Sequence, residues 1–211
     1  GLTAFNADGD RILDYKLSFR RVLLRALEVA RAENTVLCAY CNERLLAAGD
    51  AADSRIERYA SLGEAQPEAL SEADFLEQCD ALSVNKLLML ASEEEIPQLL
   101  PRLSAGLRWR PGRVVQALSW TLEVLPRGAS KGSGAKKLLK ELRVPRSLVM
   151  AIGDGENDLE MLKCAGLGVA MGNACDSLKG VAQHVVATND EDGVAEAIER
   201  FALGGEGDWR R

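Results

Sequence analysis

The stretch Leu148-Val-Met-Ala-Ile-Gly-Asp-Gly-Glu-Asn-Asp158 decides how the rest of the chain is interpreted. Its first part, residues 148–153, is apolar throughout and predicts a strand that is buried on both faces, as in a parallel sheet. Glycines on both sides of Asp154 let the backbone turn sharply from this strand into a helix. Asp154 then projects from the carboxyl end of the strand, and Asp158 follows one helical turn later, where it can face the same point.

These carboxylates predict a magnesium site. In open parallel sheets, ligands bind beyond the carboxyl ends of the strands. Hard oxygen ligands at such a position suit Mg²⁺, which keeps several waters and takes only one or two carboxylates. The alternative is that Asp154 and Asp158 are a helix cap and a surface charge, because helix starts favour Asp. The concentration of polar residues at 154–158, at a ligand-binding strand end, favours the metal site.

A second polar motif, Arg127-Gly-Ala-Ser-Lys-Gly132, opens the preceding helical pattern at residues 131–142. Ser130 is a typical helix N-cap, which places Lys131 in the first helical turn. An exposed cation is unfavourable there by about 0.3–1 kcal/mol, because the helix dipole presents its positive end. An anion bound at the same place would remove this conflict, so Lys131 is a candidate anion-binding residue.

Outside these motifs, the two parts of the chain differ in their pattern of expected strands and helices. Strand-like runs at residues 122–125, 148–153, 168–171 and 184–187 alternate with helical patterns at 131–142, 156–165, 175–181 and 193–201. This alternation predicts a parallel sheet with helices on both faces. The first part mixes short strands with longer helices and predicts an α+β domain with antiparallel strands and helices on one face. We therefore expect an α/β protein with an α+β domain at 1–117 and a parallel-sheet domain at 118–211.

Composition excludes several function classes. The 211 residues carry a net charge of −6, which gives no electrostatic reason to expect nucleic acid as a partner. No apolar run approaches the roughly 20 residues that cross a bilayer, and no signal-peptide pattern is visible. Five scattered cysteines predict a reduced, cytoplasmic protein. Cys38 and Cys41 lie in a β-prone run that points them to opposite faces, so we expect them to be structural.

Four motifs, in this order, resemble the Cof-like branch of the haloacid-dehalogenase superfamily. They are LPRGASKG (125–132), IGDGEND (152–158), GVAMGNA (168–174) and NDEDGVA (189–195). The resemblance implies a magnesium-dependent phosphatase with a Rossmann-like parallel-sheet core, acting on small phosphorylated metabolites. It also implies that residues 1–117 are the substrate-selecting cap domain of that family.

The same resemblance implies roles for individual residues. Lys131 would bind the phosphoryl group and the charge of the nucleophile, as a catalytic and phosphate-binding residue. Asp154 would be a ligand of the magnesium ion. Asn157 and Asp158 would contact the phosphate, or the metal and its waters, so Asp158 is expected to be both catalytic and metal-associated.

The nucleophile of the family has no clear counterpart. It is the first Asp of Asp-x-Asp-Gly-Thr, which forms an aspartyl-phosphate. The nearest match, Asn6-Ala-Asp-Gly9, has Asn at that place, and its Asp8-Gly9 pair predicts the turn of a hairpin between strands at 2–6 and 11–14. We therefore expect the chain to begin inside the sequence of the family, to lack the N-terminal core strand and to be inactive alone. The strand at 148–153 would then have an exposed edge, through which copies can associate.

Two function classes stay open. One is the phosphatase, whose missing segment exists in the full protein, and the other is a catalytically inactive module that binds a phosphorylated ligand or a protein partner. Other phosphate motifs fail on spacing: residues 128–134 are not followed by the Lys-Ser/Thr of a Walker loop, and 166–172 miss the dinucleotide fingerprint by one residue. His184, the single histidine, lies in an apolar run and is expected to be structural, which argues against a Ser-His-Asp hydrolase.

Overall fold

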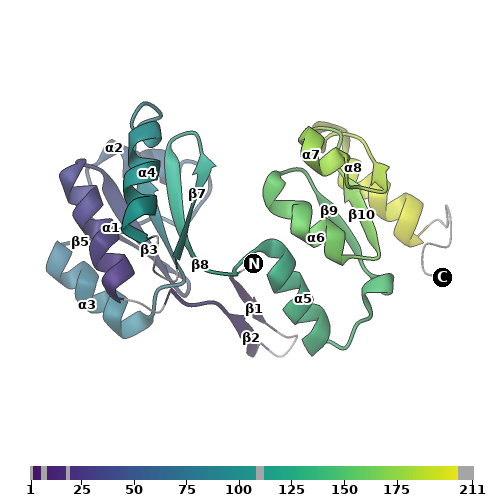
Figure 1. The fold of residues 1–211 in the computed structure, drawn as a ribbon, viewed down its shortest axis with the longest axis horizontal. Coiled ribbons are helices and arrows are strands. Elements are labelled where there is room, and N and C mark those ends of the chain that lie inside the picture. Colours follow the sequence, from purple (N-terminus) through teal and green to yellow (C-terminus); the bar gives the residue numbers. More distant parts are fainter. Residues whose placement is uncertain (1, 6–8, 18–19, 108–111, 204–211) are drawn as a thin grey trace. The chain divides into compact units, whose positions relative to one another are not determined.

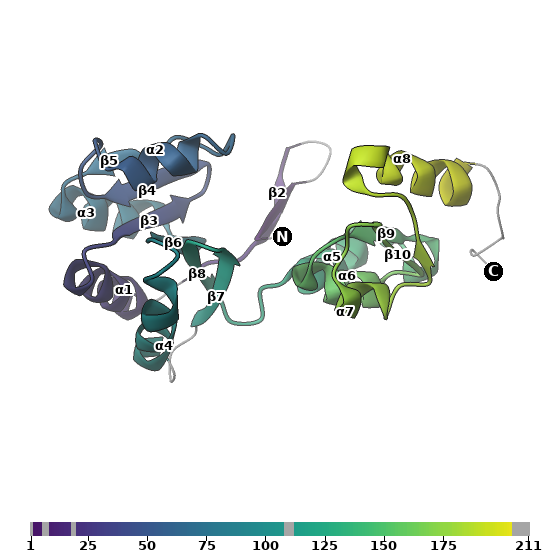
Figure 2. The ribbon, with the colours of Figure 1, turned by 90° about the horizontal axis from the view of Figure 1, so that it is seen from above.

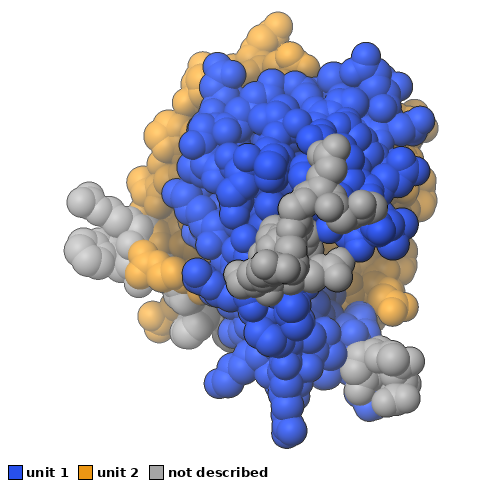
Figure 3. Space-filling model, turned by 90° about the vertical axis from the view of Figure 1, so that its right-hand side faces the viewer, with its two compact units in different colours: residues 1–14, 128–211 blue, residues 15–127 orange. Residues whose placement is uncertain are grey.

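The structure is a computed structural model that describes residues 2–5, 9–17, 20–107 and 112–203. The chain divides into two compact units, coloured separately in Figure 3. Unit 1 comprises residues 1–14 and 128–211, and unit 2 comprises residues 15–127.

Unit 2 is built on a six-stranded sheet with the strand order β5-β4-β3-β6-β8-β7 (Figure 1). All neighbours are antiparallel except β4 and β5, which are parallel. The strands are β3 (Val36–Cys41), β4 (Arg44–Ala48), β5 (Glu68–Leu70), β6 (Lys86–Leu90), β7 (Gly112–Leu118) and β8 (Thr121–Pro126). Successive side chains of a strand point to opposite faces, and accordingly Cys38 and Cys41 are buried in different hydrophobic clusters. The expectation that these cysteines lie on opposite faces is confirmed.

Helices cover both faces of this sheet unequally. The larger core cluster lies under α1 (Arg20–Ala32), α3 (Glu72–Leu82) and α4 (Ile96–Leu107). The shorter α2 (Ser54–Ala60) packs on the other face through Ile56 and Tyr59, and Figure 2 shows it across the sheet from α1 and α4. Helices on one face only were expected from the sequence, and this is wrong for α2.

Unit 1 contains the parallel sheet, with the strand order β11-β10-β9. Its strands are β9 (Met150–Gly153), β10 (Leu167–Ala170) and β11 (His184–Val185). Its α-helices are α5 (Lys131–Glu141), α6 (Leu159–Cys164), α7 (Asp176–Lys179) and α8 (Gly193–Ala197). Unit 1 also contains the 3-10 segments η1 (Arg146–Leu148), η2 (Glu156–Asp158) and η3 (Asn189–Glu191). The π-helical η4 (Ile198–Leu203) follows α8. The expected α/β fold with a parallel sheet is confirmed.

The expected domain boundary between residues 117 and 118 differs from the division into compact units. The run at 122–125 was expected to belong with the parallel alternation. It forms part of β8 instead, which pairs antiparallel with β6 and β7, and its Leu122 and Val124 are buried in the larger core cluster of unit 2. The hairpin of β1 (Thr3–Phe5) and β2 (Arg11–Asp14) belongs to unit 1, where both strands contact α5.

Some sequence expectations fall on residues that are not described. The hairpin pairing of β1 and β2 is confirmed, and Gly9 has φ +87°, a left-handed conformation suited to glycine in a turn. Asn6 and Asp8, which lie between the two strands in the sequence, are outside the described residues. Among the described residues, no helix is long and apolar enough to cross a membrane.

The free edge of β9 is the last feature that matters for the site. β9 pairs with β10 on one side, and no described strand pairs with its other side. Met150 and Ile152 are only partly buried, and Leu148, which belongs to η1, is 53% exposed. The expectation of a strand over 148–153 that is buried on both faces is therefore wrong in its start and in its burial. Among the described strands, β9 is therefore an edge strand with apolar side chains.

Candidate active site

The turn after β9 folds the Asp158 carboxylate back onto the end of the strand. Its Oδ2 accepts hydrogen bonds from the backbone N–H groups of Asp154, at 3.1 Å, and Gly155, at 3.2 Å. A Cβ atom on Gly153 would lie 2.5 Å from the Asp158 Cβ, so glycine is needed for this close approach. The result is a buried carboxylate whose side chain is only 3% exposed.

Lys131 reaches this carboxylate from α5. Ser130 caps α5 by accepting from the Ser133 N–H at 3.0 Å, and Ser133 Oγ accepts from the Ser130 N–H at 2.9 Å, which completes a capping box. Lys131 follows in the first turn, and its Nζ donates to Asp158 Oδ1 at 2.6 Å. The anion that the sequence predicted beside Lys131 therefore has a counterpart within the protein, the Asp158 carboxylate, although the Lys131 side chain stays 46% exposed.

The environment keeps Asp158 ionised. Burial would raise the pKa of its carboxyl group, because removing a charge from water is unfavourable. The hydrogen bond from Lys131 and those from the backbone of Gly155 and Asp154 favour the charged form and outweigh burial, so the pKa lies below its ordinary value. A charged Asp158 can hold the ammonium of Lys131 in place at neutral pH.

Asp154 is held by different partners and stays exposed. Its backbone C=O accepts from the Cys175 N–H at 3.0 Å, and its Oδ2 accepts weakly from Asn173 Nδ2 at 3.4 Å. Asn173 Oδ1 in turn accepts from the Asn189 N–H at 3.0 Å. The third sequence motif therefore contacts Asp154 through Asn173, and the fourth motif contacts Asn173 through Asn189. The contact of Asn173 with this carboxylate was not predicted, although its motif had been recognised.

Of the two carboxylates expected to bind magnesium, only that of Asp154 has an oxygen without a hydrogen-bond partner among the described residues. Asp154 Oδ1 has no hydrogen-bond partner among the described residues, so it is available to a metal, whereas both Asp158 oxygens already accept hydrogen bonds. Asn157 is exposed and its side chain makes no hydrogen bond among the described residues. No group of three or more His, Cys, Asp or Glu side chains suited to a metal is found in the described part of the chain. One free carboxylate and several waters match the usual surroundings of Mg²⁺.

His184, which was expected to be structural, is an exposed residue of β11. Its ring packs against that of Phe201, with the ring centroids 4.5 Å apart. The two rings belong to β11 and η4, and neither element supplies Lys131, Asp154 or Asp158.

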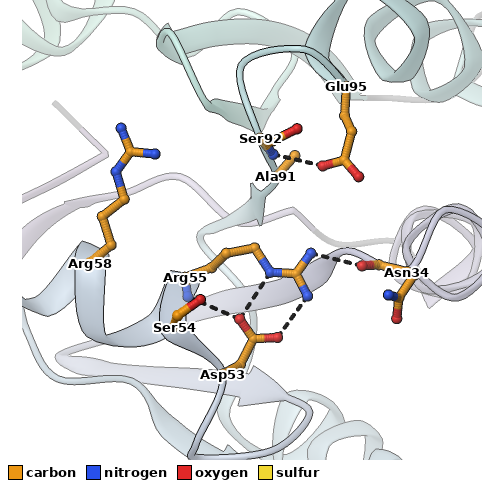
Figure 4. Close-up of a pocket in the computed structure, with 8 residues that line it drawn as sticks. All are labelled: Asn34, Asp53, Ser54, Arg55, Arg58, Ala91, Ser92 and Glu95. Atoms are coloured by element: carbon orange, nitrogen blue, oxygen red, sulfur yellow. Dashed lines mark hydrogen bonds and ion pairs between the residues drawn. The ribbon is translucent and has the colours of Figure 1, made fainter.

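A hollow of about 560 Å³ lies in unit 2, and none of the site residues named above lines it (Figure 4). Arg55 is one of the residues that line the hollow, but its guanidinium is already bound within the protein. It donates two hydrogen bonds to the Asp53 carboxylate, at 2.9 and 2.6 Å, and a third to the C=O of Asn34, at 2.7 Å. Arg58 and Glu95 add one charge of each sign, so the hollow has no excess positive charge for a phosphate. Its lining residues are Asn34, Asp53, Ser54, Arg55, Arg58, Ala91, Ser92 and Glu95.

The fold and this site define a class of protein. The model of the haloacid dehalogenase-like hydrolase family matches residues 4–198, and the chain belongs to this family. Among curated proteins, it is 34% identical over 206 residues to "Endoribonuclease YBEY, chloroplastic" of Arabidopsis thaliana, covering 96% of this chain and 34% of that protein. It is 37% identical over 123 residues to the 5-amino-6-(5-phospho-D-ribitylamino)uracil phosphatase YitU of Bacillus subtilis, covering 56% of this chain and 44% of that protein. The chain thus spans less than half the length of these curated relatives.

Solved structures agree with the family. A haloacid dehalogenase-like hydrolase from Bacteroides thetaiotaomicron matches with a TM-score of 0.83 and 32% identity, over 94% of this chain and 73% of that one. A protein of Thermotoga maritima matches with a TM-score of 0.82 and 26% identity, over 95% of this chain and 73% of that one. The resemblance to the Cof-like branch of the superfamily is confirmed.

Proposed function

We propose that this chain supplies the metal-binding and phosphate-binding part of a magnesium-dependent phosphatase for small phosphorylated metabolites. The observation that carries the proposal is the Lys131–Asp158 ion pair beside Asp154, at the carboxyl end of a parallel strand. The phosphatase YitU, with which the chain shares 37% identity over 123 residues, supports the reaction class. The match to the Arabidopsis thaliana protein covers only 34% of it, so an endoribonuclease activity is not part of this proposal.

Each residue has a proposed part in the reaction. The Lys131 ammonium would bind phosphoryl oxygens and stabilise the charge that develops on them, while Asp158 orients it. The exposed Asn157 amide would donate a hydrogen bond to the phosphate. Asp154 would hold Mg²⁺, which supplies charge neutralisation at the phosphate when bound. Asp158, whose oxygens are engaged, would contact the metal through its waters.

The attacking carboxylate is proposed to come from outside the described residues. In the described part of the chain, no third carboxylate joins Asp154 and Asp158 in a metal-type cluster. β9 has a free edge that can accept another parallel strand. The Bacteroides thetaiotaomicron structure contains further chain as well, since the match covers 73% of it. We propose that a strand paired with this edge brings the nucleophilic Asp to Asp154, and that residues 1–211 alone do not catalyse.

Unit 2 is proposed to be the substrate-selecting cap domain. This assignment rests on the size of unit 2, on its α+β architecture with a mainly antiparallel sheet, and on its position in the chain between the hairpin and the first phosphate-binding motif. Its limits would then be residues 15–127, and the hairpin would belong with the core.

A hydrolysis assay on two lengths of chain tests the proposal. We expect residues 1–211 to hydrolyse para-nitrophenyl phosphate with Mg²⁺ no faster than buffer. We expect a longer chain that includes the upstream strand to hydrolyse members of a phosphometabolite panel. Turnover by residues 1–211 that disappears in Asp8→Ala would refute the external nucleophile.

The same assay separates the alternative function. A longer chain that lacks turnover on the whole panel but binds inorganic phosphate in calorimetry would be a catalytically inactive phosphate-binding module. Both candidates are compatible with the lack of a three-carboxylate cluster among the described residues, and the assay decides between them.

A further inference from the structure

We propose that Glu160 is a positioning residue for Lys131 and acts through the helix cap Ser130. The inference rests on the proposed role of Lys131 and deepens it. Ser130 Oγ donates a hydrogen bond to the Glu160 carboxylate. The same oxygen accepts from the Ser133 N–H at 3.0 Å, so the rotamer that binds Glu160 is also the one that caps α5.

The backbone makes a second contact on the other side of Lys131. A Cβ atom on Gly132 would lie 2.4 Å from the Glu160 Cβ, and 2.7 and 2.9 Å from the Glu160 carbonyl carbon and oxygen. The first turn of α5 therefore lies directly on the backbone at Glu160, where α5 and α6 pack together (Figure 1). Both neighbours of Lys131 in sequence are held by the same residue.

This double contact restrains the backbone from which Lys131 reaches Asp158. A lysine side chain has many rotamers, and ordering it is entropically costly. A displacement of about 1 Å in a catalytic group can lower a rate strongly, so restraint of its Cα has a functional effect. None of the described hydrogen bonds or ion pairs joins Glu160 to the Lys131 ammonium itself. Glu160 thus positions Lys131 without touching the phosphate site.

Competitive acetylation tests the positioning on the 211-residue chain, without any activity. The readout is the acetylation rate of Lys131 relative to the exposed Lys136 on the same helix, measured by mass spectrometry. Glu160→Ala should raise this ratio about fivefold, roughly the factor that one hydrogen bond contributes. Glu160→Gln, whose amide oxygen still accepts from Ser130, should stay within about twofold of the wild type. Glu141→Ala, at the far end of α5, is the matched control and should leave the ratio unchanged.

The route through Ser130 is tested by a double variant. Ser130→Ala should raise the ratio, and adding Glu160→Ala should raise it no further, because both changes break the same connection. An unchanged ratio in Glu160→Ala, or additive effects in the double variant, would overturn the proposal. Circular dichroism of each variant verifies that the fold is retained.

Enzyme kinetics provide a second test of the positioning role of Glu160. In a longer chain that hydrolyses a phosphomonoester, Glu160→Ala should lower kcat/KM about fivefold, and Glu160→Gln should restore most of it. A changed acetylation ratio with unchanged kcat/KM supports the positioning and contradicts the proposed role of Lys131. If the longer chain has no activity, the proposed function fails while the acetylation result still decides the positioning.

Discussion

Lys131 Nζ lies 2.6 Å from Asp158 Oδ1, although the two residues are 27 positions apart in the sequence. The pair joins the first turn of α5 to the end of η2, and the second Asp158 oxygen accepts from two backbone N–H groups. The carboxylate is thus fixed on several sides, while the ammonium remains partly accessible. Removing either partner leaves the other charge without its main neighbour, which is costly for the buried Asp158.

Replacing Lys131 by Ala should abolish most activity in a longer, hydrolytically active chain. Steady-state kinetics should show a fall in kcat/KM of more than about tenfold, because a charged donor to the phosphoryl group is lost. Lys136→Ala, on the exposed part of the same helix, is the control and should keep wild-type kinetics. Equal rates in the two variants would exclude Lys131 from the phosphate site.

Replacing Asp154 by Ala should raise the magnesium concentration needed for half-maximal rate and lower the rate by more than about tenfold, because the free carboxylate oxygen is removed. The measurement is the rate as a function of magnesium concentration in the longer chain. Asp176→Ala, an exposed carboxylate at the start of α7, is the matched control. A wild-type magnesium dependence in Asp154→Ala would remove Asp154 from the metal site.

Acid should weaken the fold partly through Asp158. Burial raises the pKa of its carboxyl group, but the hydrogen bonds from Lys131 and the backbone lower it further, so the folded-state pKa is below the ordinary value. A depressed folded-state pKa contributes stability that is fully present above the ordinary Asp pKa of about 3.9 and is lost as the pH falls through the folded-state value.

Urea unfolding at a series of pH values measures this contribution. The difference in unfolding free energy between wild type and Asp158→Asn should be constant near neutral pH and should shrink below a pH of about 4. A difference that stays the same down to the acid limit would show that the pKa of Asp158 is not lowered by folding.

Adding one methyl group at Gly153 should destabilise unit 1. In Gly153→Ala the new Cβ would lie 2.5 Å from the Asp158 Cβ, and the resulting overpacking should cost about 1–3 kcal/mol of unfolding free energy. Gly180→Ala is the comparison, because its Cβ would lie 3.3 Å from the nearest atom, the Asp176 carbonyl oxygen. Denaturant midpoints of the two variants give the test, and equal midpoints would mean that Asp158 is not held against the strand end.

The free edge of β9 should make residues 1–211 associate with themselves. Unpaired apolar edges recruit other strands, so light scattering should show dimers or larger species that are absent in a longer chain with the edge covered. Leu148→Lys, which places a charge at the exposed last residue of η1, two positions before β9, should reduce the association. Tight magnesium binding by a strictly monomeric 211-residue chain would show instead that the core is already complete.

Local patterns in the sequence predicted the main elements of the site, although the strand expected at 148–153 begins only at Met150. The apolar run before Asp154 predicted β9, the serine before Lys131 predicted the start of α5, and the spacing of Cys38 and Cys41 predicted their opposite faces. Such predictions succeed because a strand alternates every second residue and a helix cap acts within three residues, so neighbouring side chains determine the outcome.

Only the tertiary structure decided which distant groups meet. It pairs Lys131 with Asp158, brings Asn173 to Asp154, and places Leu122 in the antiparallel sheet of unit 2. These outcomes depend on which faces pack and on the backbone approach at Gly132 and Gly153, contacts between segments that no short window contains. β8 begins at Thr121, shortly after the end of β7 at Leu118, and so short a connection permits only an antiparallel pair. The further antiparallel pairing with β6, which is distant in the sequence, is a tertiary contact that buries Leu122 and Val124 in the larger core cluster of unit 2.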